Sequence, residues 1–88
     1  MTIYVFGAVK TPGAVQLDSS MPTTLMAAIA QAGGPTSSAK ESDIKIKRKS
    51  ASGPESVIKA NLKDILKGKV PDIPIFEGDV ITVPESFF

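Results

Sequence analysis

Four basic residues are crowded into one short segment of the chain, Lys45, Lys47, Arg48 and Lys49. In an extended strand the alternate positions 45, 47 and 49 share one side and lie about 6–7 Å apart. Lys59 follows in the next segment and would stand across a hairpin from them. Such a row of ammonium groups could bind acidic sugars, phosphates or nucleic acid. The alternative is a solvated strand face whose lysines discourage edge-to-edge pairing. No aromatic residue is interleaved with these lysines, so the segment itself lacks a stacking platform.

Aromatic residues are few, and two of them, Tyr4 and Phe6, share one side of the first predicted strand. If that side faces outward, the two rings could form a subunit contact or a sugar platform. If it faces inward, they belong to the core. We expect the core, because the chain offers few other large side chains to fill it. Phe87 and Phe88 are expected to anchor against a neighbouring part of a longer protein rather than to form a site.

The residue types that most enzymes use for chemistry are missing. The chain has no His and no Cys, which removes the usual general base, the thiol nucleophile and the zinc–thiolate site. The carboxylates Glu77 and Asp79 flank one glycine, and Glu41 and Asp43 are two positions apart, but calcium loops need a denser oxygen cluster. Asp79 is expected to cap the backbone of its own turn. We therefore expect no catalytic residue, no metal site and no cofactor.

The glycines are expected to shape the backbone. Gly33 and Gly34 follow a helix, whereas a phosphate-binding loop precedes one, and they lie mid-chain rather than at a ubiquitin-like tail. The pair therefore predicts a helix stop, with Gly33 in the left-handed position. Pro12 and Gly13, with Gly7, could shape a ligand-facing loop, but we expect them to satisfy hairpin geometry.

The elements that must position these residues follow from hydrophobic spacing and turn residues. A type II turn at 10–13 predicts that the first two strands form a hairpin. Apolar residues one helical turn apart predict the main helix, with Thr23 or Thr24 as N-cap. Asn61 caps a second, short helix that Gly68 ends, and residues 50–56 form a hairpin tip. Strands are predicted at 3–6, 14–17, 43–49, 57–60, 75–76 and 80–83, and helices at 25–32 and 62–67.

This order, β-β-α-β-β-(short α)-β, predicts an α+β fold of the β-grasp type, with one main helix packed on a mixed four- to five-stranded sheet and a short second helix. Its 88 residues suffice for one domain. The net charge of +1 argues against a dedicated duplex-DNA binder. No apolar run approaches the roughly 20 residues that a membrane-spanning helix needs.

Four segments, in order, resemble the motifs of the soluble-ligand-binding β-grasp (SLBB) domain. Residues 5–15 are similar to the opening V-x-G-x-V-x-x-P-G-x-y, and residues 24–34 to the helix T-L-x-x-A-I-x-x-A-G-G. Residues 61–68 resemble D-L-x-x-L-L-K-G, and residues 77–84 resemble P-G-D-x-I-x-V-P. The motif residues that would set the backbone are Gly7, Pro12, Gly13, Gly33, Gly34, Gly78 and Asp79.

The resemblance implies the setting of polysaccharide export proteins, whose subunits form a ring around a translocation channel. For this chain it implies one SLBB domain over residues 1–88, excised from a longer exported protein at the periplasmic face of the Gram-negative envelope and associated with the outer membrane. The implied partners are a weakly bound polysaccharide, further copies of the full-length protein and the rest of the export machinery. No nucleic acid is expected as a partner, and no membrane span is expected in this segment. The alternative is a free-standing ligand- or nucleic-acid-binding module that uses the basic strand 45–49. The candidate ligand-binding residues are Lys45, Lys47, Lys49 and Lys59.

Overall fold

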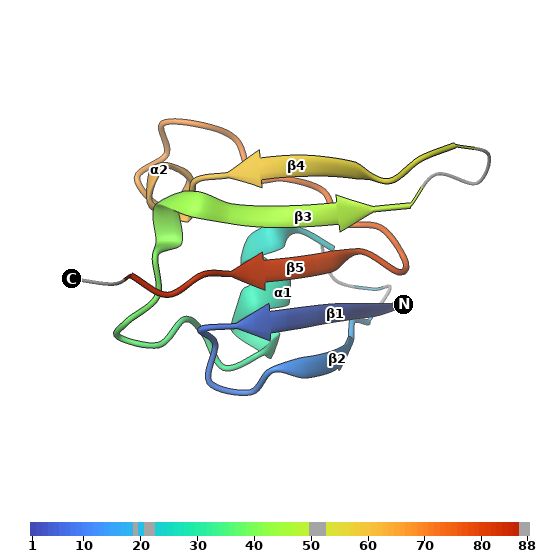
Figure 1. Cartoon of the computed structure of the whole chain (residues 1–88), viewed down its shortest axis with the longest axis horizontal. Helices are drawn as coiled ribbons and strands as arrows, with labels where there is room; N and C mark the ends of the chain where they lie inside the picture. The colour runs from blue at the N-terminus through green and yellow to red at the C-terminus, as the bar shows by residue number, and fades with distance from the viewer. Residues whose placement is uncertain (19, 21–22, 50–52, 87–88) are drawn as a thin grey trace.

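A mixed five-stranded sheet forms the body of the protein, and α1 lies behind it in the view of Figure 1. The structure is a computed structural model that describes residues 1–18, 20, 23–49 and 53–86. The elements, in chain order, are β1 (Thr2–Gly7), β2 (Gly13–Gln16), α1 (Leu25–Gln31), the 3₁₀ helix η1 (Glu41–Asp43), β3 (Ile44–Arg48), β4 (Ser56–Ala60), α2 (Leu62–Leu66) and β5 (Val80–Val83). The predicted α+β fold of the β-grasp type is confirmed.

The last strand, β5, occupies the centre of the sheet, whose order is β2-β1-β5-β3-β4. It runs parallel to β1, where Val5 pairs with Ile81, and antiparallel to β3, where Ile46 pairs with Ile81. The N-terminal hairpin and the β3–β4 hairpin therefore reach one another only through β5 (Figure 1).

The core lies between the sheet and α1. Each of the three inner strands presents alternate aliphatic residues to it, as the period of two requires. On α1, Leu25, Ala28 and Ile29 form the buried face, which confirms the predicted helical spacing. The fully enclosed strand residues are Ile3, Val5, Ile44, Ile46, Ile81 and Val83.

Both ends of α1 follow the local chemistry of the sequence. The Thr24 side chain accepts a hydrogen bond from the Ala27 N–H at 3.4 Å, so Thr24 is the N-cap. At the other end the Gly34 N–H donates to the Ile29 carbonyl and the Gly33 N–H to the Ala30 carbonyl. This is a Schellman ending, with Gly33 in the left-handed region at φ +87°.

The short helix α2 is also capped as expected, because the Asn61 side chain accepts a hydrogen bond from the Asp64 N–H at 3.2 Å. The turn at Glu77–Gly78 is confirmed, with the Asp79 N–H donating to the Phe76 carbonyl. A strand at 75–76 is wrong: these two residues are in no strand, and the isolated bridge nearby joins Thr24 to Pro74, just before them. Their N–H groups donate elsewhere, that of Ile75 to the Thr23 carbonyl and that of Phe76 to the Asp79 carboxylate.

Two expectations about β1 are also wrong. Tyr4 and Phe6 are not core residues, because the alternation places Ile3 and Val5 inward and leaves the two rings 38% and 44% exposed. The hairpin is not closed by a tight turn at 10–13 either. Val5 pairs with Gly13, so residues 6–12 form the connection, and Gly13 begins β2. The tip residues 50–52 and the terminal Phe87 and Phe88 lie outside the described residues.

Gly7, at the end of β1, is held against the backbone of β5. A Cβ atom built on Gly7 would lie 2.2 Å from the Val83 carbonyl oxygen. Gly7 also has a φ of +95°, a conformation that side chains rarely adopt. The same carbonyl oxygen accepts a hydrogen bond from the Ala8 N–H at 2.7 Å. Only glycine lets β1 and β5 approach this closely.

Gly7→Ala is therefore expected to lower the free energy of unfolding by about 2–4 kcal/mol, because a backbone clash is added to a strained φ. Gly34→Ala is the matched control, since Gly34 has a similar φ of +85° but nothing within 4 Å of its added Cβ. Its loss should be near 1 kcal/mol. Urea unfolding of both variants measures the difference, and equal losses would contradict a special role for the Gly7–Val83 approach.

Candidate functional site

The face of the sheet away from α1 carries the chemistry that the sequence singled out. Side chains of paired residues share a face, so the strand registers define two rows across it. One row contains, from β2 to β4, Ala14, Tyr4, Val80, Lys47 and Val57. The other contains, from β1 to β4, Phe6, Thr82, Lys45 and Lys59. We call this surface the open face; in the part of the chain that the structure describes, no helix covers it (Figure 1).

Tyr4 and Phe6 form an aromatic pair on the β1 side of the open face. Their ring centroids are 6.4 Å apart and the ring planes differ by 7°. Both residues are exposed and stand on a strand that is hydrogen-bonded on both sides, so the rings are presented by a rigid support. An exposed aromatic ring can stack against the apolar face of a sugar ring or a base.

Lysines occupy the β3–β4 side of the same face. Lys45 and Lys47 alternate with the buried Ile44 and Ile46 and are exposed, as the sequence predicted. Lys59 on β4 pairs directly with Lys45 on β3 and is exposed as well. Lys49 is exposed but follows the end of β3. The structure thus brings Lys45, Lys47 and Lys59 together on one surface.

The proximity of the rings to the lysines cannot be seen in the order of residues along the chain. The basic segment has no aromatic neighbour along the chain, yet β1 is separated from β3 only by β5. Thr82 of β5 pairs with Phe6 on one side and with Lys45 on the other. A signal was available in the alternation of β1, where the aliphatic Ile3 and Val5 could fill the core and send the rings outward.

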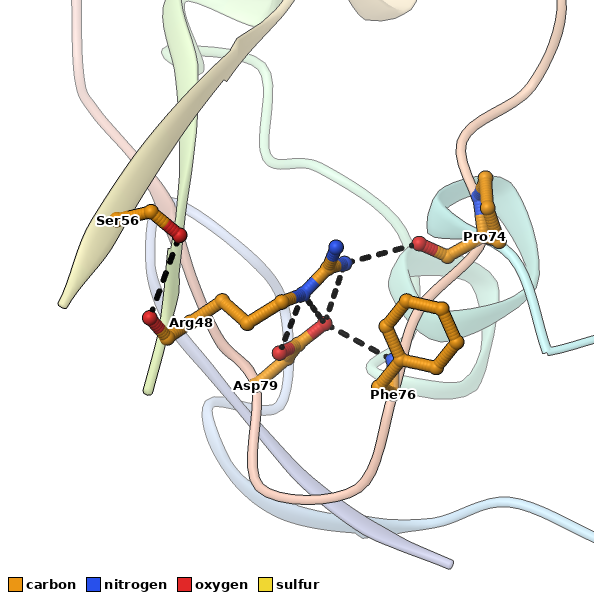
Figure 2. A network of polar contacts seen from close by, with 5 residues as sticks. All are labelled: Arg48, Ser56, Pro74, Phe76 and Asp79. Carbon is orange, nitrogen blue, oxygen red and sulfur yellow. Dashed lines mark hydrogen bonds and ion pairs between the residues drawn. The ribbon is translucent and has the colours of Figure 1, made fainter. Parts of the chain in front are cut away.

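Arg48 does not belong to the free basic surface. Its Nη2 lies 2.9 Å from Oδ2 of Asp79, and its Nε donates to both carboxylate oxygens at 3.1 and 3.3 Å. The same Nη2 donates to the Pro74 carbonyl, and the guanidinium carbon lies 4.4 Å from the centroid of the Phe76 ring. Figure 2 shows the guanidinium enclosed between these groups. A partner distant in sequence thus takes up the charge of Arg48, so the basic segment presents its lysines but not this guanidinium.

Asp79 combines the capping role that was expected with this ion pair. Its carboxylate accepts a hydrogen bond from the Phe76 N–H at 2.9 Å, which closes the turn before β5 (Figure 2). The Asp79 residue is 1% exposed, and a buried carboxylate is stable only when it is paired and hydrogen-bonded. Asp79 is thus a structural residue that ties the start of β5 to the end of β3.

The glycine and proline motif residues lie off the open face. The loop that contains Pro12 runs beside the segment after α1, since the Lys10 N–H donates to the Gly34 carbonyl and the Thr11 N–H to the Ala32 carbonyl. Gly33 packs against this loop, with its added Cβ 3.0 Å from Cβ of Lys10. Gly13 and Gly78 also take positive φ values, +133° and +84°. Their arrangement accords with the expected backbone role, and none joins the lysines.

A hollow with a volume of about 200 Å³ lies between α1 and α2, away from the open face. Glu41 is the one charged residue among those that line it, so its walls offer burial but few groups to orient a ligand. The lining residues are Met26, Ile29, Ala30, Gly34, Pro35, Glu41, Leu62 and Leu66. The open face offers two kinds of contact and is therefore the better candidate.

Over residues 2–59 the sequence matches the SLBB domain family. The chain belongs to the SLBB domain family. The match covers more than half of the chain and includes both hairpins and α1 of this SLBB domain. SLBB domains are binding rather than catalytic modules, which agrees with a site of rings and lysines. A comparison with curated proteins finds no match.

Two further observations bear on the site of the SLBB domain. Among its described residues, no helix has the length and apolar character to cross a membrane. No buried side-chain nitrogen or oxygen of the described part lacks a hydrogen-bond partner. The buried polar side chains of the described part are thus all hydrogen-bonded, as is usual in native proteins.

Asp79→Ala is expected to lower the free energy of unfolding by about 2–3 kcal/mol, because it leaves the Phe76 N–H without its acceptor and the Arg48 guanidinium without its carboxylate. This loss is smaller than that for a fully buried ion pair, because the Arg48 side chain is 24% exposed and can turn to water. Glu85→Ala, which removes an exposed carboxylate, should change stability by no more than about 0.5 kcal/mol. Equal chemical-denaturation midpoints for the two variants would show that the network does not hold the β5 turn.

Proposed function

We propose that this SLBB domain is a non-enzymatic saccharide-binding and assembly module of a polysaccharide export protein. In this proposal residues 1–88 form one domain of a longer exported protein at the periplasmic face of the Gram-negative envelope, associated with the outer membrane. Copies of that protein form a homo-oligomeric channel with the rest of the export machinery, and the domain braces the channel while contacting the passing polymer. Family membership supports the setting.

The observation that carries the binding part of the proposal is the stacked, exposed pair of Tyr4 and Phe6 on a rigid sheet. Large apolar side chains are normally buried, so two adjacent exposed rings on a well-formed strand suggest a contact surface. A sugar ring has an apolar face that can lie on such a pair, while its hydroxyl groups remain in water. Contacts of this size are individually weak, which suits a polymer that must also leave.

The alternative is a ligand- or nucleic-acid-binding module that acts through the basic strand. The two rings favour it more than the sequence alone did, because aromatic and basic side chains on one sheet face also suit single-stranded nucleic acid. The overall charge of +1 weighs against it, since such proteins usually carry a clear positive excess. Titration with an oligonucleotide of mixed sequence separates the two functions.

The proposal is tested by recording amide chemical shifts during titration with neutral and acidic oligosaccharides. Shifts that saturate and cluster on β1, β5 and β3 are expected. Phe6→Ala and Tyr4→Ala should each weaken binding about two- to tenfold, the effect of losing about 0.5–1.5 kcal/mol of ring contact.

Leu66→Ala is the control, because Leu66 is a large exposed apolar residue on α2, away from the open face. It should bind as the unchanged domain does. No shifts with any sugar up to millimolar concentration would reject saccharide binding and leave a purely structural role in the assembly.

A further inference from the structure

The open face has two chemically different halves. In the two rows, the β1 side carries the rings of Tyr4 and Phe6 and no charged residue. The β3–β4 side carries Lys45, Lys47 and Lys59. Neither row contains a carboxylate. Between the halves stand Val80 and Thr82, which are half-buried and small, so no large side chain separates rings from ammonium groups.

One pair within the cationic half is unfavourable to the fold itself. Lys45 and Lys59 are direct cross-strand partners, and like charges placed opposite one another destabilise a sheet. Among the described residues the ion pair that forms is Arg48–Asp79, at the other end of β3, and it does not neutralise them. An anion bound between the two ammonium groups would remove this repulsion.

We propose that the open face binds an anionic polysaccharide that lies across the strands, with a sugar ring on Tyr4 and Phe6 and a carboxylate between Lys45 and Lys59. The inference rests on the proposed saccharide-binding function and names its substrate class. Neighbouring strands are about 4.8 Å apart, so β1 and β3 are separated by about 10 Å and β1 and β4 by about 14 Å. A chain crossing the sheet can therefore occupy both halves with different residues of one polymer.

An acidic polysaccharide fits this division better than a nucleic acid does. Each nucleotide carries a phosphate, so a bound strand favours a basic track along its whole path. In the two rows, lysines lie only on β3 and β4, and the residues of β1 and β5 carry no positive charge. A polymer with neutral and acidic units matches rings on one side and lysines on the other.

The experiment uses two probes with the same backbone, a short oligosaccharide in which neutral sugars alternate with glucuronic acid, and its methyl ester, which lacks the negative charge. We expect the acidic form to bind more tightly at about 0.01 M salt and to lose most of that advantage at about 0.15 M, because exposed charges are screened. Amide shifts from the acidic form should extend over β1, β3 and β4, and those from the ester should stay on β1 and β5.

Lys59→Glu is the decisive variant, because binding and stability should change in opposite directions. Affinity for the acidic oligosaccharide should fall about five- to thirtyfold, since one attraction is lost and one repulsion is added. The melting temperature of the free domain should rise by about 1–4 °C, because the like-charged pair becomes an opposite-charged one. Lys69→Glu makes the same charge change outside the two rows and should leave binding within about twofold.

The outcomes separate this inference from the function on which it rests. Equal binding of acid and ester, with shifts on β1, overturns the anionic substrate and leaves saccharide binding intact. Binding of neither probe rejects both. Tighter binding of an oligonucleotide to the same face, or concentration-dependent self-association with shifts confined to it, would assign the face to a nucleic acid or to a second copy and overturn the inference.

Discussion

The central position of β5 is the constraint on which the rest of the molecule depends. This strand comes last in the fold but lies between β1 and β3, so two hairpins form one sheet only when it is inserted. Its parallel contact with β1 requires that Gly7 approach the Val83 carbonyl more closely than any side chain permits. Because paired residues share a face, the same insertion decides which side chains stand together. The rings of β1 and the lysines of β3 meet on one surface only because Thr82 and Val80 pair with both strands.

The ion pair of Arg48 and Asp79 fixes this insertion where β5 begins. Breaking such a pair by removing one partner is strongly unfavourable, whereas replacing both partners by apolar groups often is not. Here the carboxylate binds the end of β3 and the Phe76 N–H together (Figure 2). The pair also removes one of the four cations of the basic segment from the surface. The basic side chains that remain exposed here are those of Lys45 and Lys47 on β3, Lys59 on β4, and Lys49 after the end of β3.

The sequence predicted best what is decided locally. The ends of α1 depend on Thr24 and Gly33, whose neighbours in sequence complete the hydrogen bonds, and the alternation of β3 shows directly which residues face the core. Prediction from the sequence failed where a residue's contacts lie far away along the chain. Alternation shows that β1 has two faces but not which one is covered, so Tyr4 and Phe6 were placed on the wrong side. Arg48 meets its carboxylate 31 residues further along the chain, beyond the reach of any local pattern.

A solvated sheet face is ordinary in a small α+β domain, but its usual composition is polar and mixed in charge. The open face departs from that composition in two ways, with exposed rings at one side and facing lysines at the other. The facing lysines are unfavourable for folding, and both departures lie on strands that are otherwise well paired. A rigid sheet holds the two groups at a fixed separation, so a polymer that engages one is already positioned for the other without further ordering of the protein. Weak contacts joined in this way can retain a chain along the surface, while each single contact remains easy to release.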